Sequence, residues 1–123
     1  MNLSNLRKVM SVTGESGKKY RFKMYKLDEN AERLYDMCPN FQDFGGIYIF
    51  IKQYKYTNYR DLIYCGKTED LSNRFYDHHK EDDIVEENPN YICIIRSNTD
   101  EDRTSIEKDI LGGNDFTCNE MLN

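Results

Sequence analysis

At 123 residues, the chain has the length of one domain with a single core. Its 38% hydrophobic and 13% aromatic residues exclude a disordered tail. No apolar run approaches the roughly 20 residues of a membrane span or the apolar core of a secretory signal, so we expect a cytoplasmic location and no membrane partner. A formal net charge of −5 argues against a dedicated nucleic-acid binder, because phosphate neutralisation supplies most non-specific affinity. The four cysteines lie far apart, which suggests neither a zinc site nor a disulfide framework.

Charge divides the chain near residue 44. Residues 1–44 carry eight Lys/Arg and six Asp/Glu, a net charge of +2, which leaves −7 for residues 45–123. Between residues 18 and 26, basic side chains alternate with Tyr, Phe and Met, a pattern typical of a strand with one apolar and one basic face. A short helix is expected over 28–37. We therefore predict an N-terminal β/α extension over 1–44 and a second unit over 45–123.

The second unit combines apolar strands with two helices. The runs at 47–51 and 62–66, separated by a tyrosine-rich loop, are typical of an antiparallel hairpin. The acidic stretch over 81–90 is expected to be a solvated connector. The remaining predicted elements are a helix over 71–80, a strand over 91–95, and a helix over 99–111 that ends in a left-handed cap at Gly112 and Gly113. The predicted fold class is α+β, a small antiparallel sheet of about three strands flanked by helices.

Glu107 is the most informative single residue. Its predicted helix buries Ile106 and Ile110, and Glu107 lies at the edge of that apolar stripe. A carboxylate at such a position is costly unless a cation or a metal ion pairs with it. The ordinary alternative is a boundary glutamate that bonds Arg103, one helical turn away, or reaches water.

Two pairs of side chains follow helix and strand spacing. Arg74 and His78 lie one turn apart on the predicted helix, so both could contact one phosphate, with the histidine as a proton acceptor near neutral pH. An exposed polar helix face is the ordinary alternative. Tyr48 and Tyr64 lie on adjacent predicted strands, where a buried tyrosine usually belongs to the core. Taken one at a time, none of these residues identifies a function.

In chain order, however, these residues form one series. The series is Gly46-Ile47-Tyr48, Tyr64-Cys65-Gly66-Lys67, Arg74, His78, Glu107 and Asn119. It resembles the motif series of the GIY-YIG nuclease superfamily, from residue 45 to about residue 119. Cys65 replaces the more common isoleucine or valine, and His78 stands where some members have tyrosine and others have histidine. The stretch between the two motif tyrosines is longer than in the shortest members, and the first 44 residues are not covered by the resemblance.

The resemblance implies an endonuclease that hydrolyses DNA phosphodiester bonds, with Mg²⁺ or Mn²⁺ held by Glu107. Arg74 would stabilise charge on the scissile phosphate. Tyr48 would activate the attacking water, with Tyr64 and His78 bonded nearby. A free tyrosine has a pKa of about 10 and needs a local cation for this role, so His78 is the second candidate for the general base.

Three further features belong to this hypothesis. Lys67 would supply positive charge at the site, and Asn119 would tie the C-terminal segment to it without a chemical role. The acidic unit over 45–123 lacks a surface for DNA, and the basic strand face of Lys19, Arg21 and Lys23 is the candidate for that surface. The alternative is an edge strand whose lysines protect against aggregation.

Two other readings of the chain stay open. One is a catalytically inactive binding or inhibitory module that keeps the nuclease fold, which the charge of −7 over residues 45–123 favours. The other is a structural interaction protein whose motif match is accidental. Target choice would come from a protein partner or from a second copy of the chain, because 123 residues barely accommodate a separate specificity region.

Overall fold

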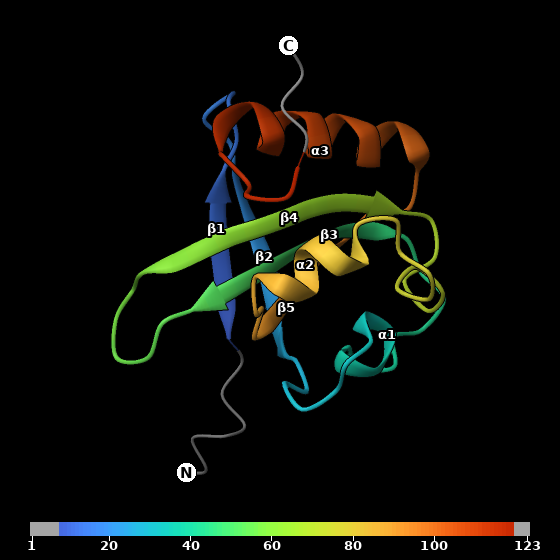
Figure 1. Ribbon diagram of the computed structural model, residues 1–123. Helices are drawn as coiled ribbons and strands as arrows, with labels where there is room; N and C mark the ends of the chain where they lie inside the picture. The colour runs from blue at the N-terminus through green and yellow to red at the C-terminus, as the bar shows by residue number, and fades with distance from the viewer. Residues whose placement is uncertain (1–7, 120–123) are drawn as a thin grey trace, which may run out of the picture.

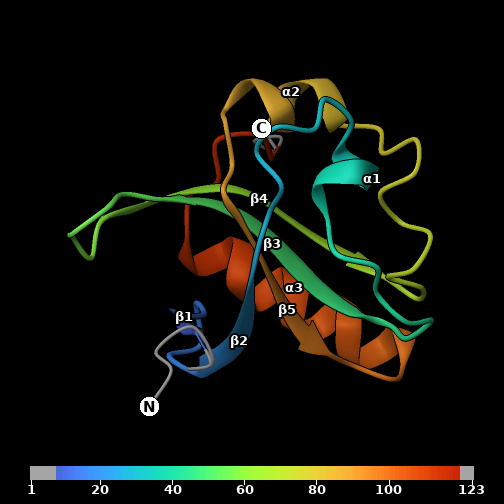
Figure 2. The same ribbon diagram turned by 90° about the horizontal axis from the view of Figure 1, so that it is seen from below.

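The computed structural model describes residues 8–119, which form one antiparallel five-stranded sheet. Helix α3 covers one face of the sheet, and helices α1 and α2 cover part of the other (Figures 1 and 2). The elements are β1 (Val9–Thr13), β2 (Lys19–Lys26), α1 (Leu34–Met37), β3 (Gly46–Gln53), β4 (Arg60–Thr68), α2 (Glu81–Glu86), β5 (Tyr91–Arg96) and α3 (Asp100–Gly113). The strand order β1-β2-β5-β3-β4 leaves β1 and β4 at the edges of the sheet.

The prediction of a small sheet of about three strands flanked by helices is wrong. β1 and β2 form a hairpin in which Met10 lies opposite Phe22, and β2 then pairs with β5, where Met24 lies opposite Cys93. The predicted N-terminal extension therefore contributes two strands to the sheet that contains β3, β4 and β5. The cause is the apolar face of β2, because Tyr20 and Phe22 are buried in the cluster beneath α3.

The predicted helix over 71–80 is also wrong. Residues 71–77 form successive turns, and Asp77 has a left-handed φ of 62°, which a continuing α-helix does not allow. A helix instead follows at α2, inside the acidic stretch that was expected to be a connector. The carboxylate of Glu81 accepts a 2.6 Å hydrogen bond from Arg33, which offsets the cost of burying it.

The other two predicted helices form with different lengths. α1 is only four residues long and ends at Met37, because Cys38 has the extended backbone expected of a residue before proline. The predicted helix over 99–111 is confirmed by α3, but α3 continues through Gly113 and the next residue is extended, so the expected left-handed cap does not form. Among residues 8–119, no helix is long and apolar enough to cross a bilayer.

The sheet separates two apolar clusters. On one face, Ile47 and Ile49 of β3 pack against Ile110 of α3. On the other face, Tyr48 and Phe50 of the same strand pack with residues of α1 and α2. Because β3 is central and covered on both sides, it is a nearly continuous apolar run instead of an alternating one.

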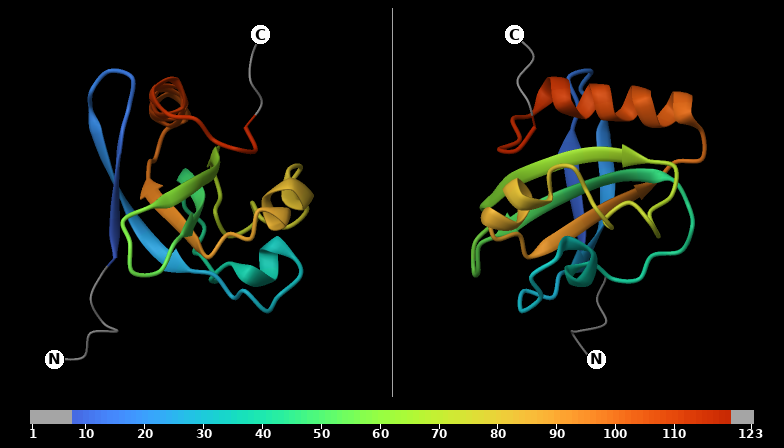
Figure 3. Two further views of the ribbon diagram at one scale, coloured as in Figure 1. Left: turned by 60° about the vertical axis from the view of Figure 1, so that its left-hand side comes forward. Right: turned by 45° about the vertical axis from the view of Figure 1, so that its right-hand side comes forward.

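The β1–β2 hairpin stands beside the α1–α2 layer, and that layer does not cover it (Figure 3). Its outward residues on β2 are the basic ones, Lys19, Arg21 and Lys23. The edge strand is β1, whose sequence VMSVT carries no charge, whereas β2 pairs with β1 and, from Lys23 onward, with β5. β2 is therefore an inner strand at Lys23, whereas Lys19 and Arg21 lie on the part of β2 that pairs only with β1.

Candidate functional site

The centre of the site is a hydrogen bond between two buried side chains, Tyr48 and His78. The Tyr48 hydroxyl is 2.7 Å from Nε2 of His78, and the two side chains are 0% and 4% exposed. The backbone N–H of Lys80 donates to Nδ1 of His78 at 3.0 Å. A neutral imidazole has one donor and one acceptor nitrogen. Nε2 therefore carries the proton of neutral His78 and donates it to the Tyr48 oxygen.

Burial keeps both partners of this hydrogen bond neutral. Burial, together with the smaller effects of the nearby charges of Arg74 and His79, lowers the pKa of His78 from 6.5 to about 3. Burial raises the pKa of Tyr48, whereas the charge of Arg74 acts to lower it. At pH 7 both nitrogens of His78 are engaged, and neither has a free lone pair for a water molecule.

The glycines of the two sequence motifs allow close approach around this pair. Gly66 on β4 lies opposite Tyr48 on β3, and a Cβ atom at Gly66 would overlap the Tyr48 hydroxyl and ring. A Cβ atom at Gly46 would overlap the backbone carbonyl of Ile95 on β5. Only glycine fits at both positions, because any larger residue would push the strands apart or displace the tyrosine.

Arg74 connects Tyr48 to a second histidine. Its guanidinium carbon lies 5.9 Å from the centre of the Tyr48 ring, and Nη2 lies 3.4 Å from Nδ1 of His79. Nε2 of His79 is 3.5 Å from the Tyr64 hydroxyl, and its ring stacks on His78 with 4.8 Å between the ring centres. His79 was not among the predicted site residues, because a continuous helix would point adjacent histidines in different directions. The only sequence feature that could have pointed to His79 is that it directly follows His78.

Glu107 approaches the site from α3, on the opposite face of the sheet. It is half-buried, and burial raises the pKa of its carboxyl, whereas the charges of Lys67 and Arg74 lower it. Arg103 does not pair with it, because the Arg103 guanidinium donates to the carbonyl of Ser97 at 2.9 Å. Within residues 8–119, the Glu107 carboxylate has no hydrogen-bond or ion-pair partner.

Edge strand β4 separates these two groups of residues. Tyr64 faces the α1–α2 layer, and Lys67 faces α3, where its ammonium donates to the Thr104 hydroxyl at 2.6 Å. Burial raises the pKa of Tyr64, Arg74 lowers it, and the negative charge of Glu107 raises it. The charge of Glu107 thus acts across the strand, and the candidate site lies around the edge of β4.

The C-terminal segment covers a neighbouring part of the same edge. The backbone N–H groups of Thr117 and Cys118 donate to carbonyls of β4 at 3.0 and 2.8 Å. The Asn119 side chain then accepts from the N–H of Cys65 and donates to its carbonyl, both at 2.9 Å. The side-chain amide of Asn119 therefore makes the two hydrogen bonds that a paired strand residue would make, and it holds the C-terminal segment beside the candidate site.

The carboxylate of Glu107 is an oxygen ligand of the kind that hard divalent cations prefer, and the charges of Lys67 and Arg74 act on it as well. Mg²⁺ usually keeps several waters and binds through one or two carboxylates together with substrate phosphates. In the part of the chain that the structure describes, no three His, Cys, Asp or Glu side chains converge as a metal cage. Phosphate and water oxygens would therefore complete the coordination, and the half-buried, unpaired carboxylate of Glu107 fits that role.

The three basic residues of β2 lie outside this cluster but on the same face of the sheet as Tyr48. We call them the cationic row: Lys19, Arg21 and Lys23. Lys23 lies opposite Ile94 on β5, and Ile94 lies opposite Tyr48 on β3. Paired residues share a face and strands lie about 4.8 Å apart, so Lys23 is roughly 10 Å from Tyr48 between Cα atoms. Arg96, two residues after Ile94, is exposed and adds a fourth cation, which was not among the predicted DNA-binding residues.

No protein-family model matches the chain, and comparisons with curated proteins and with solved structures give no match. The nuclease resemblance is therefore a hypothesis, to be judged on these residues and their geometry.

Proposed function

We propose that the chain is a metal-dependent endonuclease of the GIY-YIG type, which hydrolyses phosphodiester bonds of DNA. The observation that carries this proposal is the unpaired carboxylate of Glu107 within the electrostatic reach of Arg74, which also contacts Tyr48. A boundary glutamate would bond Arg103 or reach water, but Arg103 bonds Ser97 instead, which leaves the half-buried carboxylate of Glu107 available to a metal ion.

Arg74 is the proposed phosphate ligand. Its guanidinium can form two parallel hydrogen bonds with phosphate oxygens and stabilise the charge that develops during hydrolysis. Its place between Tyr48 and His79 would hold the scissile phosphate beside the Tyr48 hydroxyl. When bound at Glu107, Mg²⁺ or Mn²⁺ would supply charge stabilisation for the leaving oxygen.

Tyr48 is a better general base than His78. Both nitrogens of His78 are engaged, and a pKa of about 3 makes it a weak proton acceptor at pH 7. Burial raises the pKa of Tyr48 and disfavours the phenolate, whereas the hydrogen bond from His78 and the charge of Arg74 favour it. The proposed role requires these two interactions to outweigh the burial when substrate is bound. The phenolate could then accept a proton from the attacking water. Tyr64, bonded to His79, would help to orient that water.

The cationic row is the proposed path of the DNA duplex toward Tyr48. Together with Arg96, the cationic row places four cations on one face. This face would attract DNA phosphates although the chain as a whole has a net negative charge. Phosphate contacts of this kind supply affinity that does not depend on DNA sequence. Target choice would then come from a protein partner or from a second copy of the chain.

A plasmid-nicking assay in Mg²⁺ or Mn²⁺ tests the proposed activity. The Glu107→Gln variant should keep the fold and lose cleavage, because the amide is neutral and a poor ligand for a hard cation. Glu101→Gln is the matched control, since Glu101 is exposed on the first turn of the same helix, and it should cleave like the wild type. Native cleavage by the Glu107 variant would contradict the metal assignment.

The same assay separates the inactive-module alternative. A wild-type protein that binds DNA but does not nick it in either metal would be a binding or inhibitory module. The negative charge of residues 45–123 is the observation that favours that outcome.

A further inference from the structure

The tip of the β3–β4 hairpin displays tyrosines to solvent, and at its base the Tyr54 hydroxyl donates to the carboxylate of Asp61 at 2.7 Å. Its sequence over residues 52–60 is KQYKYTNYR, with three cations and three tyrosines. Tyr54, Tyr56 and Tyr59 are 38%, 103% and 64% exposed. Tyr56 follows Tyr48 by eight residues, so at about 3.3 Å per residue the tip lies on the order of 20–25 Å from the candidate active site.

The tip is built to hold Tyr56 outward. The N–H of Tyr54 donates to the carbonyl of Tyr59 at 3.1 Å, which closes the loop. The Gln53 amide donates to the carbonyls of Thr57 and Tyr59, both at 3.0 Å. Tyr56 itself has a left-handed φ of 63°, a conformation that glycine or asparagine adopts more easily. A large aromatic ring is thus kept fully exposed at a position that disfavours it.

A positively charged groove of about 770 Å³ lies beside this tip. Four cations line it, against one carboxylate, Glu29: these are Lys8, Lys26, Lys55 and Arg60. A local charge of this sign in a chain with a net charge of −5 favours an anionic ligand. The volume falls within the roughly 300–1,000 Å³ of ordinary ligand pockets.

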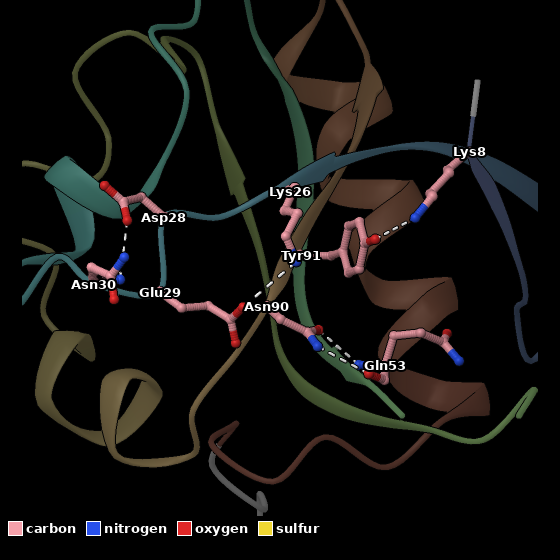
Figure 4. A network of polar contacts seen from close by, with 8 residues as sticks. All are labelled: Lys8, Lys26, Asp28, Glu29, Asn30, Gln53, Asn90 and Tyr91. Atoms are coloured by element: carbon pink, nitrogen blue, oxygen red, sulfur yellow. Dashed lines mark hydrogen bonds and ion pairs between the residues drawn. The ribbon is translucent and has the colours of Figure 1, made fainter. Parts of the chain in front are cut away.

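Tyr91, which we call the floor of the groove, lines it together with Lys8 and Lys26, and both lysines lie close to its ring (Figure 4). The ammonium groups of Lys8 and Lys26 lie 4.9 and 5.4 Å from the centre of the Tyr91 ring, and Lys8 also donates to its hydroxyl. Asn90 joins this floor to the hairpin, because its side chain bonds the backbone N–H and carbonyl of Gln53 at 2.8 and 2.9 Å. Floor and tip are therefore held together as one surface.

We propose that this groove binds unpaired nucleotides of DNA, with a base stacked on Tyr56 and phosphates bound by the cations of the groove. Exposed aromatic rings combined with a positively charged groove are how proteins bind single strands without sequence preference. The bases of a duplex are already stacked on each other, so they do not offer a free face to an aromatic ring. The inference rests on the proposed function for the choice of DNA. The preferred substrates would then be DNA molecules with a single-stranded segment beyond the scissile bond.

Binding in EDTA tests the inference without cleavage. Fluorescence anisotropy with the full chain would compare a labelled 12-nucleotide oligothymidylate with a 12-base-pair duplex. Tyr56→Asn removes the ring and suits the left-handed backbone. It should weaken oligothymidylate binding by roughly 5- to 150-fold, the value of one stacked base, and leave duplex binding within about twofold. Tyr56→Phe should bind like the wild type. Tyr35→Asn, which removes a partly exposed tyrosine elsewhere, is the control and should have no effect.

A tryptophan reporter provides a second measurement. The chain has no tryptophan, so a Tyr56→Trp variant reports only on the tip, and its emission should be quenched by oligothymidylate. Unchanged oligothymidylate affinity in Tyr56→Asn, equal losses for single strand and duplex, or unquenched emission at saturation would each overturn the inference. Failure of metal-dependent plasmid cleavage would refute the proposed nuclease instead, and it would not alter these binding results.

Discussion

His78 should make the stability of the protein depend on pH in a characteristic way. Its pKa is about 3 in the folded state and 6.5 in the unfolded chain. Because the folded value is the lower one, the unfolded state takes up the proton first as the pH falls. This contribution to stability is complete above pH 6.5 and is lost progressively between pH 6.5 and pH 3. Integration of the two titrations gives a loss of about 2 kcal/mol between pH 7 and pH 5 from this one side chain.

Urea unfolding at pH 7 and pH 5 measures that loss. The reference is His78→Gln, whose amide can still donate to the Tyr48 hydroxyl but does not titrate in this range. Other groups titrate in both proteins, so the wild type should lose about 2 kcal/mol more than the variant on acidification. A difference below about 0.5 kcal/mol, the usual limit of such comparisons, would refute the buried, neutral state of the ring. An NMR titration of wild-type His78 is the parallel test, and it should show a neutral ring at pH 5.

Three further predictions concern the site and its approach. Gly66→Ala should destabilise the fold by roughly 1–3 kcal/mol in urea unfolding, because the added methyl group would overlap Tyr48. Tyr48→Phe should lower the cleavage rate on the order of 10²- to 10⁴-fold, and near-native turnover in that variant together with an inactive His78→Ala would exchange the two roles. Glutamine at all three positions of the cationic row should flatten the slope of log K against log salt by up to roughly 3 units. An unchanged slope in the folded triple variant would assign the row to solubility.

Local sequence patterns predicted those elements whose cause lies within a few residues. The strands over 47–51, 62–66 and 91–95 are confirmed within β3, β4 and β5. The start of α3 was also readable, because the Thr99 hydroxyl accepts from the N–H of Asp102 and caps the helix. The alternation along β2 correctly indicated its buried and exposed faces. For the strands, the periodicity of the side chains indicates which face is buried.

The turns over 71–77 show where such patterns fail. Arg74 and His78 have helical spacing, yet Asp77 is left-handed and no helix forms there. Both residues nevertheless contact Tyr48, because the turns bend the chain back over β3. Arg74 and His78 were therefore correctly expected to lie near each other, but helical spacing is not the cause. The departure from a helix also brings His79 beside Tyr64.

Local patterns in the sequence were enough to predict the faces of the strands, the position of α3 and the polar residues that could share a site. They did not predict that β2 joins β5 in a five-stranded sheet, that Arg103 bonds Ser97 instead of Glu107, or that Tyr48 bonds a histidine 30 residues away. The two groups of features differ in the range of the interactions that produce them. Alternation and capping act between neighbouring residues, whereas strand pairing and the burial of charge depend on which distant segments the core brings together.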